Sequence, residues 1–409
     1  MKYLVLLGDG MADLPLKELN GKTPMAAAKK PLIDWMAAHG EVGMCFITPE
    51  GCKGGSDVGN LAAMGYDPRV YLTGRAPLEA AAMGIKMSEE DIAFRCNLAC
   101  VSDEPVYEDK TMVDYSSDEI STEEAAELIA ALNEALADDL MQFHAGISYR
   151  HLLILHKGSC DIRLTPPHNI TGQPVKTYLP EGEGAELLLS IMKKSYEILS
   201  QHPVNLKRAA AGKRMANTCW FWGVGSKPGL SPFDKKYGKT GAAVTAVDLV
   251  RGIARLADMD TYDVEGATGT LETNFMGKVK ATLTAYDEDH DFCYLHFEAP
   301  DECGHRHEIE RKVKSVEMLD TVLTHVVNGL KARGEDYGIL VMPDHPTPIS
   351  TGAHSSAPVP YLLYYSNQEK QSPVTNFCEA EAEKTGCVQQ VGYELLARFF
   401  EEGDAHGTV

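Results

Sequence analysis

The sequence predicts an α/β fold in which a sheet is sandwiched by helices and a separate, smaller α/β domain is inserted into the chain. Apolar runs of strand length alternate with amphipathic helical stretches along most of the 409 residues, a pattern typical of α/β proteins. Acidic and imidazole side chains directly follow several of these runs, where open α/β sheets build their sites. A chain of this length exceeds what one hydrophobic core usually serves, so two domains are expected.

The elements follow from hydrophobic periodicity. Strands are predicted at residues 2–8, 42–47, 151–156, 218–224, 292–298, 337–343 and 359–365. Helices are predicted at residues 24–39, 121–137, 185–201, 243–257, 309–333 and 389–401. Ser121 and Glu124 form a capping box, which sets the start of the second predicted helix.

Charge and composition exclude several classes of partner. The formal net charge of −21 argues against binding to nucleic acid or to an anionic membrane surface. A phosphate site in such a chain has to be made locally positive by metal ions and a few Arg or Lys residues. The sequence does not indicate an oligomeric state.

Cysteine usage and the N-terminus predict a location. The ten cysteines show no CxxC spacing, and the chain starts directly on a strand-like run without a signal peptide. No segment has 18 consecutive apolar residues, the length that a membrane helix requires. We therefore expect free thiols and a cytoplasmic protein.

Three strand-like runs lead directly into acidic or imidazole residues, and His354 follows the last of these runs. The candidate metal ligands are Asp9, Asp301, His305, Asp344, His345 and His354. Residues four apart share one side of a helix, so Asp301 and His305 can bind one ion, while Cys303 between them points elsewhere. Each pair alone also fits a helix cap or an Asp–Pro turn. Their combination predicts an enzyme with two metal ions.

These ligands lie at both ends of the chain and must meet in space. The middle of the chain carries no comparable set. The sequence therefore predicts a discontinuous domain formed by residues 1–78 and 214–409, interrupted by an inserted domain at residues 79–213.

A glycine-rich loop at residues 51–60 contains the candidate nucleophile, Ser56. Glycines let the backbone approach a ligand closely, and N–H groups at the start of a following helix bind anions. A serine hydroxyl on a metal ion is deprotonated near neutral pH and needs no histidine base. The alternative for Ser56 is an N-cap on the next helix.

Motifs for nucleotides are incomplete. Gly238, Lys239 and Thr240 resemble the end of a P-loop, but the upstream glycine is replaced by Phe233. Gly223-Val-Gly225 does not continue as a dinucleotide fingerprint. These failures argue against an enzyme that uses ATP or NAD.

Several cationic residues lie beside apolar segments and are candidates for substrate binding. They are Arg75, Arg95, Arg150, His151, His168 and Lys239. Arginine holds phosphate or carboxylate groups with two parallel hydrogen bonds. For any one of these residues a surface salt bridge is the alternative role.

Ten strings run in order through nearly the whole chain: GDGMADLP, GGSDVGNLAAMGYDP, TGRAPLEAA, FRCNL, YRHLLIL, TPPHN, ANTCWFWGVG, EAPDECGH, PDHPTPIS and AHSSAPVPYLLYY. This pattern resembles the archaeal-type, 2,3-bisphosphoglycerate-independent phosphoglycerate mutases of the alkaline phosphatase superfamily. YRHLLIL and WFWGVG are similar to a bacterial branch of this family that has been proposed to act as homoserine kinase.

The resemblance implies an alkaline-phosphatase-like metal domain with an inserted phosphotransferase domain. It implies two divalent ions, Mn²⁺ in the first place, with Mg²⁺, Co²⁺ or Zn²⁺ as alternatives. One ion would be held by Asp9, Ser56, Asp344 and His345, and the other by Asp301, His305 and His354. Ser56 matches the serine that is phosphorylated. The family usually has His-Asp after Pro-Pro, whereas this chain has His168-Asn169, so the acid/base role of that aspartate does not carry over.

The implied activity is interconversion of 3-phosphoglycerate and 2-phosphoglycerate through a phosphoserine, so the partner that the resemblance implies is a small phosphorylated metabolite. The alternative is a homoserine kinase-like phosphotransferase, or a phosphatase, of the same superfamily. A mutase needs no nucleotide, which agrees with the incomplete P-loop.

Overall fold

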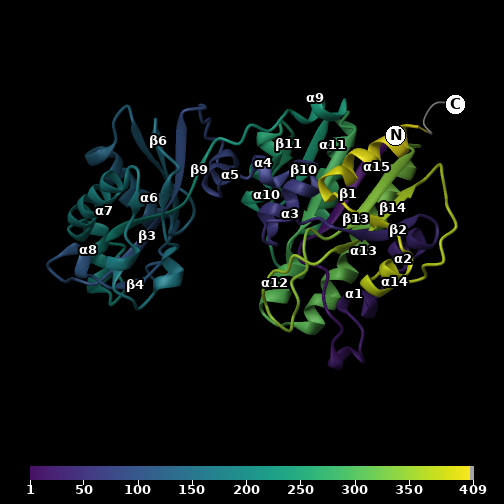
Figure 1. Ribbon diagram of the computed structural model, residues 1–409, viewed down its shortest axis with the longest axis horizontal. Coiled ribbons are helices and arrows are strands. Elements are labelled where there is room, and N and C mark those ends of the chain that lie inside the picture. Colours follow the sequence, from purple (N-terminus) through teal and green to yellow (C-terminus); the bar gives the residue numbers. More distant parts are fainter. Residues whose placement is uncertain (406–409) are drawn as a thin grey trace. The chain divides into compact units, whose positions relative to one another are not determined.

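The computed structural model describes residues 1–405 and divides into two compact units. One unit comprises Met1–Leu72 and Gly229–Val409, and the other comprises Thr73–Pro228 (Figure 1). These boundaries differ from the expected ones at 78/79 and 213/214. The reason is that β9 (Thr218–Ser226) pairs with β3 (Asp91–Val101), so the strand expected in the larger unit belongs to the sheet of the smaller unit.

The larger unit is built on one mixed sheet, and its strand order is β11-β10-β12-β1-β13-β14-β2-β15. In that order the strands are Asp260–Tyr262, Gly241–Val244, Phe292–Phe297, Lys2–Gly8, Tyr337–Met342, Val359–Tyr365, Glu41–Cys45 and Val388–Gln389. Strands β12, β1 and β13 are parallel neighbours, whereas β14 is antiparallel to both β13 and β2. The carboxyl ends of the three central strands therefore meet at one edge.

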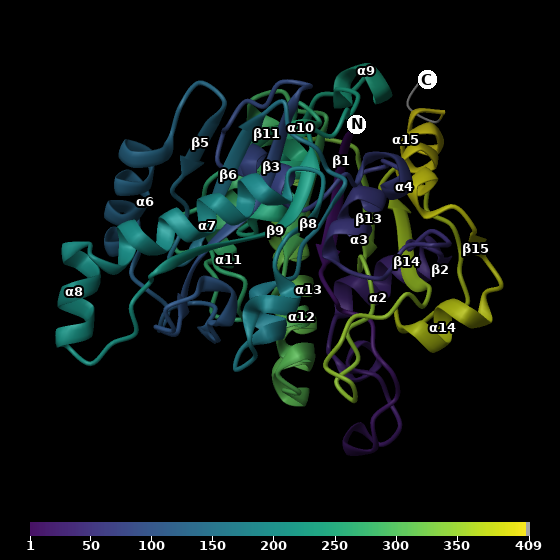
Figure 2. The same ribbon diagram turned by 60° about the vertical axis from the view of Figure 1, so that its left-hand side comes forward.

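Alternating side chains of these strands face two helical layers, because successive residues of a strand point to opposite faces. Leu4 and Leu6 of β1 lie in the core formed with α1, α2, α11 and α13, which are Pro24–Ala27, Pro31–Ala38, Phe275–Asp287 and Ile309–Ala332. Tyr3 points the other way and packs edge-on against Phe399 and Phe400 of α15 (Leu395–Asp404). Figure 2 shows β1, β13 and β14 between α13 and α15. The expected sheet sandwiched by helices is confirmed.

The remaining helical elements of this unit connect the strands at the surface or near the ligands. They are η1 (Lys17–Leu19), α3 (Ser56–Ala63), α4 (Pro68–Tyr71), α9 (Phe233–Tyr237), α10 (Asp248–Leu256), α12 (Ala299–His305), α14 (Glu379–Lys384) and η5 (Gly392–Glu394). Of these, α3 begins with Ser56, and α12 contains Asp301 and His305.

The smaller unit has an antiparallel sheet around β3, which pairs with β4 (Met112–Asp114), β6 (Arg150–His156) and β9, while β5 (Met141–His144) pairs with β6. A short hairpin joins β7 (Ile162–Arg163) and β8 (Glu181–Gly182). Its helices are α5 (Ala76–Ala82), η2 (Tyr107–Asp109), α6 (Thr122–Leu136), η3 (Pro167–Ile170), η4 (Val175–Tyr178), α7 (Ala185–Ser200) and α8 (Pro203–Ala210). Phe94, Cys96 and Leu98 of β3 share a core with Leu128 of α6 and Ile191 of α7.

Three predicted helices are wrong in detail. The helix expected at 24–39 is broken into α1 and α2, because Pro31 cannot donate the backbone hydrogen bond that would continue a helix. The segment 243–257 contains the end of β10 before α10 begins, and the last helix starts at Leu395 rather than at 389. The 11-residue strand β3 was missed altogether.

No helix within residues 1–405 is long and apolar enough to cross a membrane. The expected cytoplasmic location stays a prediction.

Candidate active site

Three central strands of the larger unit deliver acidic residues to one edge of the sheet. Asp9 directly follows β1, Asp344 follows β13 after one residue, and Asp301 lies in the helix α12 that follows β12. Because the three strands are parallel neighbours, their carboxyl ends and these side chains converge, as expected for an open α/β sheet. Asp9 Oδ1 lies 3.2 Å from His345 Nε2, although the two residues are far apart in sequence.

Asp9, Asp344 and His345 form a fully buried group whose ligand atoms lie within 4.8 Å of one another. The hydroxyl of Ser56, the first residue of α3, borders this group. Its Oγ lies 3.4 Å from Asp9 Oδ1 and 3.2 Å from His345 Nε2. Ser56 therefore lies beside the three residues that the family resemblance assigns to the same ion.

Asp301, His305 and His354 form a second, more exposed group. One turn of α12 separates Asp301 from His305, and His305 Nε2 lies 3.1 Å from Asp301 Oδ2. His354, from the loop between β13 and β14, approaches with its Nε2 2.9 Å from His305 Nε2. The ring centroids of His345 and His354 lie 4.1 Å apart, so the two groups are neighbours.

The electrostatics of the first group indicate that it is built for a cation. Burial, and then the charge of Asp9, raise the pKa of Asp344 well above its usual range. Burial alone would also raise the pKa of Asp9, but hydrogen bonds from His296 and His345 outweigh it and lower that pKa. Burial opposes protonation of His345, yet the charges of Asp344 and Asp9 raise its pKa to about 10. A divalent ion would take over this compensating role.

The second group shows the same tendency. The hydrogen bond to Asp301 raises the pKa of His305 to about 9. Burial would raise the pKa of Asp301, but hydrogen bonds from His305 and His354 hold it far below the usual range. Carboxylate oxygens and imidazole nitrogens without thiolate suit Mn²⁺, Mg²⁺, Co²⁺ or Zn²⁺. The donor sets of both groups thus fit divalent cations.

The close packing around the candidate ligands requires glycine at two positions. Gly10 has φ of +59°, and a Cβ there would overlap the side chain of Asp301. A Cβ on Gly59 of α3 would overlap Asp344. Larger residues at either position would push the ligands apart.

His296 and Thr245 form a supporting chain that the sequence pattern did not reveal. His296 Nε2 lies 2.9 Å from Asp9 Oδ2, and its Nδ1 lies 3.1 Å from Thr245 Oγ1. Thr245 Oγ1 in turn accepts the Val247 N–H at 3.0 Å. A carboxylate only accepts hydrogen bonds, so the polarity runs from Val247 through the Thr245 hydroxyl and the His296 ring to Asp9. His296 is hidden within the apolar run of β12, where a buried core histidine is the ordinary interpretation.

Four of the six candidate substrate residues lie together in the smaller unit, and Arg95 is at their centre. Its Nε lies 2.9 Å from Glu79 Oε2, and its guanidinium lies 4.0 Å from the centre of the Trp222 ring. Glu79 also pairs with Arg75 at 3.2 Å. Burial lowers the pKa of Arg95 to about 10; the Glu79 charge opposes this, and the nearby Arg75 and Arg150 add to it.

His168 completes this group. Its ring lies 5.4 Å from that of Trp222, and its pKa is lowered by partial burial and by the charges of Arg95 and Arg75. Trp222 is itself fixed, because its Nε1 donates to Asn97 Oδ1 at 2.9 Å. Three arginines and a histidine with one neighbouring carboxylate form a locally positive site in an acidic chain. We refer to Arg75, Arg95, Arg150 and His168 as the arginine group.

The structure places His151 and Lys239 elsewhere. His151 pairs with Cys96 in the β3–β6 ladder and shares its face, opposite to that of Arg95. Lys239 lies at the amino-terminal edge of the other sheet, 2.8 Å from Asp404 and over the ring of Tyr3. Strand alternation, which sets the face of His151, could have been applied if β3 and its pairing had been recognised.

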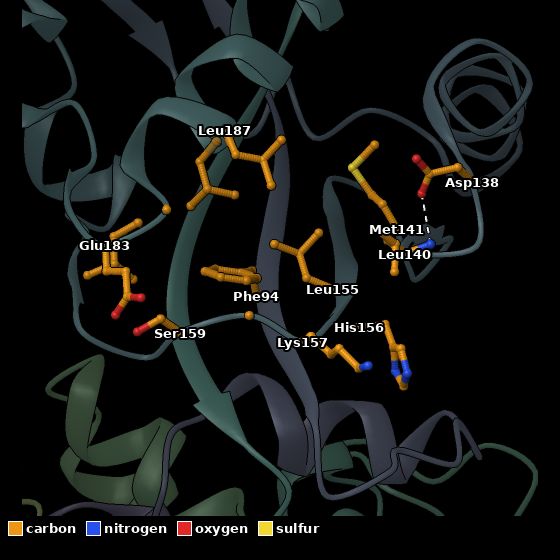
Figure 3. A pocket seen from close by; sticks show the side chains of 14 residues that line it. Phe94, Asp138, Leu140, Met141, Leu155, His156, Lys157, Ser159, Glu183 and Leu187 are labelled. Carbon is orange, nitrogen blue, oxygen red and sulfur yellow. Dashed lines mark hydrogen bonds between the residues drawn. The ribbon is translucent and has the colours of Figure 1, made fainter.

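A pocket of about 430 Å³ opens on the helical face of the smaller sheet. Figure 3 shows Phe94 and Leu155 at its floor, with Leu187 and Met141 beside them. Phe94 and Arg95 are successive residues of β3 and point to opposite faces. This pocket is therefore separate from the arginine group.

Comparison with known proteins agrees with the resemblance. The family profile described as "2,3-bisphosphoglycerate-independent phosphoglycerate mutase" matches residues 37–205. The profile "Type I phosphodiesterase / nucleotide pyrophosphatase" matches residues 177–348.

Curated relatives match over almost the whole chain. A protein of Geobacter sulfurreducens named "Probable 2,3-bisphosphoglycerate-independent phosphoglycerate mutase" is 46% identical over 97% of this chain and 98% of its own length. One of Methanosarcina barkeri, named as the same mutase, is 45% identical over 94% and 95%.

Solved structures show the same fold. A protein of Pyrococcus horikoshii superposes with a TM-score of 0.82 at 28% identity, covering 100% of this chain and 98% of its own. The cofactor-independent phosphoglycerate mutase of Thermoplasma acidophilum has a TM-score of 0.68 at 24% identity, covering 98% and 99%.

Burial of His151 predicts a pH-dependent stability. Burial lowers its pKa to about 4, and its Nε2 has no hydrogen-bond partner among the described residues. An unfolded histidine takes up a proton near pH 6.5, so the unfolded state is favoured as the pH falls from about 6.5 to 4. We expect this residue to lower the free energy of unfolding by about 2–3 kcal/mol between pH 7 and 4.5.

Urea unfolding of wild type, His151→Gln and His325→Gln at both pH values measures this contribution. His151→Gln should lose less stability on acidification than the wild type, whereas the exposed His325→Gln should behave as the wild type does. Equal losses in all three proteins would contradict the prediction.

Loss of the hydrogen bonds that link Thr245 through His296 to Asp9 is expected to weaken cation binding at the first group. Groups that hydrogen-bond to metal ligands typically contribute about 10- to 100-fold to metal affinity. We expect His296→Leu to lower Mn²⁺ affinity by that factor, as measured by isothermal titration calorimetry. His325→Leu, on an exposed position of α13, is the matched control, and an unchanged affinity in His296→Leu would rule out the supporting role.

Proposed function

The chain belongs to the 2,3-bisphosphoglycerate-independent phosphoglycerate mutases, and on this premise we propose that it interconverts 3-phosphoglycerate and 2-phosphoglycerate through a phosphoserine at Ser56. It is then an isomerase that transfers a phosphoryl group within one molecule. The observation that carries the proposal is the Ser56 hydroxyl, held at the start of α3 within 3.4 Å of Asp9 and 3.2 Å of His345.

Two divalent cations are part of the proposal. Asp9, Asp344 and His345, with Ser56, would hold one ion, and the other three ligands described above would hold the second. Mn²⁺ is the proposed ion, with Mg²⁺, Co²⁺ or Zn²⁺ as alternatives. When bound, the ions supply positive charge that lowers the pKa of the serine hydroxyl and stabilises the transferring phosphoryl group.

Ser56 would act as the nucleophile. The Ser56 hydroxyl gives up its proton as a bond forms between its Oγ and phosphorus, the bond from phosphorus to the 3-oxygen of the glycerate breaks, and the 3-oxygen takes up a proton to become a hydroxyl. The 2-hydroxyl then gives up its proton and its oxygen bonds to phosphorus, the bond from phosphorus to Ser56 Oγ breaks, and Oγ takes up a proton, which restores the serine. Atoms balance within the substrate and the enzyme, and neither water nor nucleotide is consumed.

The arginine group is proposed to bind the anionic ends of the substrate. Arg95 is stacked on Trp222 and paired with Glu79, so its guanidinium is fixed before an anion arrives. Arg75, which is half exposed, keeps donors free to reach a carboxylate or phosphate. His151 and Lys239 are left out of this proposal because of where they lie.

A homoserine kinase-like phosphotransferase is not favoured. The relatives that match 94% to 97% of this chain are named as mutases. A kinase would also need a nucleotide site, for which the sequence has no recognised pattern.

A coupled assay of Mn²⁺-loaded protein on 3-phosphoglycerate tests the function. We expect 2-phosphoglycerate to appear without added nucleotide or bisphosphoglycerate. Ser56→Ala should lower turnover by at least about 1,000-fold, the range expected when a covalent nucleophile is lost. Ser200→Ala in the smaller unit should retain wild-type turnover.

A parallel reaction with ATP and homoserine separates the alternatives. Release of ADP only in the presence of homoserine, without mutase turnover, would transfer the assignment to the kinase. Full mutase turnover in Ser56→Ala would leave the mutase but exclude the phosphoserine.

The arginine group predicts a defect in substrate binding. Arg95→Lys keeps the charge but loses the planar fork that binds an anion with two hydrogen bonds. We expect KM for 3-phosphoglycerate to rise by about 10- to 100-fold, the equivalent of one charge-assisted hydrogen bond. The control is Arg163→Lys on the exposed hairpin, and a KM of wild-type size in Arg95→Lys would remove Arg95 from the site.

A further inference from the structure

Thr347, in the loop after β13, contacts ligands of both candidate cation groups. Its hydroxyl donates a hydrogen bond to Asp301 Oδ1 in the second group. The same Oγ1 lies 3.1 Å from Nδ1 of His345 in the first group. Thr347 is fully buried, and its hydroxyl thus links the two groups.

The direction of these hydrogen bonds follows from proton counting. Thr347 Oγ1 donates to the Asp301 carboxylate, and a carboxylate only accepts hydrogen bonds, so the single hydroxyl proton of Thr347 is directed to Asp301. The hydroxyl oxygen must then accept from His345, which requires a proton on Nδ1 of that ring. His345 Nε2 is left to face Asp9 Oδ1 at 3.2 Å and Ser56 Oγ at 3.2 Å. The Thr347 hydroxyl therefore orients the Asp301 carboxylate of the second group. It also leaves Nε2 as the ring nitrogen with which His345 faces the first group.

The surroundings of Thr347 are built to hold it in place. The buried Nζ of Lys312 donates to its carbonyl oxygen at 2.7 Å, and its own N–H donates to the Ala12 carbonyl at 3.2 Å. A Cβ on Gly10 would overlap its hydroxyl, and a Cβ on Gly304 would overlap its backbone and side chain. Serine keeps the hydroxyl and valine keeps nearly the same volume, so the hydroxyl can be tested separately from the volume.

We propose that Thr347 is a positioning residue that couples the two cation sites, so that loss of its hydroxyl weakens both together. The inference rests on the proposed cation ligands and goes beyond them, because it assigns a residue that binds neither ion. Thr245 provides the contrast. Its hydroxyl reaches Asp9 alone, through His296, and belongs to the first site only.

The experiment counts bound Mn²⁺ by titration with electron paramagnetic resonance, which detects the free ion. The variants are Thr347→Val, which removes the hydroxyl at nearly constant volume, Thr347→Ser, which retains it, and Thr245→Val. Thr347→Val should lose about 10- to 100-fold in affinity at both sites. Thr347→Ser should stay within about threefold of wild type. Thr245→Val should lose affinity at one site.

A measurement on the wild type keeps the inference testable if Thr347→Val does not fold, as judged by circular dichroism. In protein loaded with diamagnetic Zn²⁺, nuclear magnetic resonance should detect a proton on Nδ1 of His345 that is close in space to the Thr347 methyl group. A proton-free Nδ1 would overturn the inference.

The remaining outcomes separate the inference from the proposed function. Wild-type protein that binds fewer than two Mn²⁺ would overturn the ligand assignment and the role of Thr347 with it. Wild-type protein that binds two, with Thr347→Val losing neither site or only one, would overturn the coupling and leave the proposed function intact.

Discussion

The larger unit depends on three carboxylates that are held away from water at one edge of its sheet. Asp9, Asp301 and Asp344 are brought together by parallel neighbouring strands, and their like charges repel in a medium where water cannot screen them. Burial, and then the charge of Asp9, raise the pKa of Asp344; the hydrogen bond to Asp301 raises the pKa of His305, and the charges of Asp344 and Asp9 raise the pKa of His345 against its burial. Divalent ions bound at these groups would balance the carboxylate charge.

Much of the surrounding structure serves to keep these groups in register. The glycines at positions 10 and 59 leave space for carboxylates and backbone that no side chain could share. Each carboxylate also receives hydrogen bonds from residues outside the ligand set: Asp9 from His296, Asp301 from Thr347, and Asp344 from Asn60 at 2.8 Å. Such donors fix orientation before a cation binds, so less reorganisation is needed when it does.

The smaller unit carries a cluster of positive charge, although the chain as a whole is acidic. Arg95 is buried at a strand position, and its charge is balanced by Glu79 and by the face of Trp222. The helical face of the same sheet is apolar and carries the separate pocket near Phe94. Strand alternation thus divides this sheet into a structural face and a chemical face, and it explains why adjacent residues of β3 have unrelated roles.

The residues along the chain were enough to select the candidate ligands that the fold brings together, because acids and imidazoles directly after apolar runs stand out locally and because the glycine-rich loop marks Ser56. They also predicted seven strands and the long helices with clear periodicity. The tertiary structure alone decided the rest, for physical reasons. In β3 the residues Phe94, Cys96 and Leu98 alternate with Arg95 and Asn97, but the strand is buried on both faces and has alanine at positions 93 and 99, so the alternation is too short to predict a strand by itself. Which unit β9 joins is set by hydrogen bonds to that same strand. His296 and Thr347 are interpreted from the sequence as an ordinary core histidine and a turn residue until folding brings them against Asp9 and Asp301, since hydrogen bonds that span 287 and 46 residues leave no local trace in the sequence.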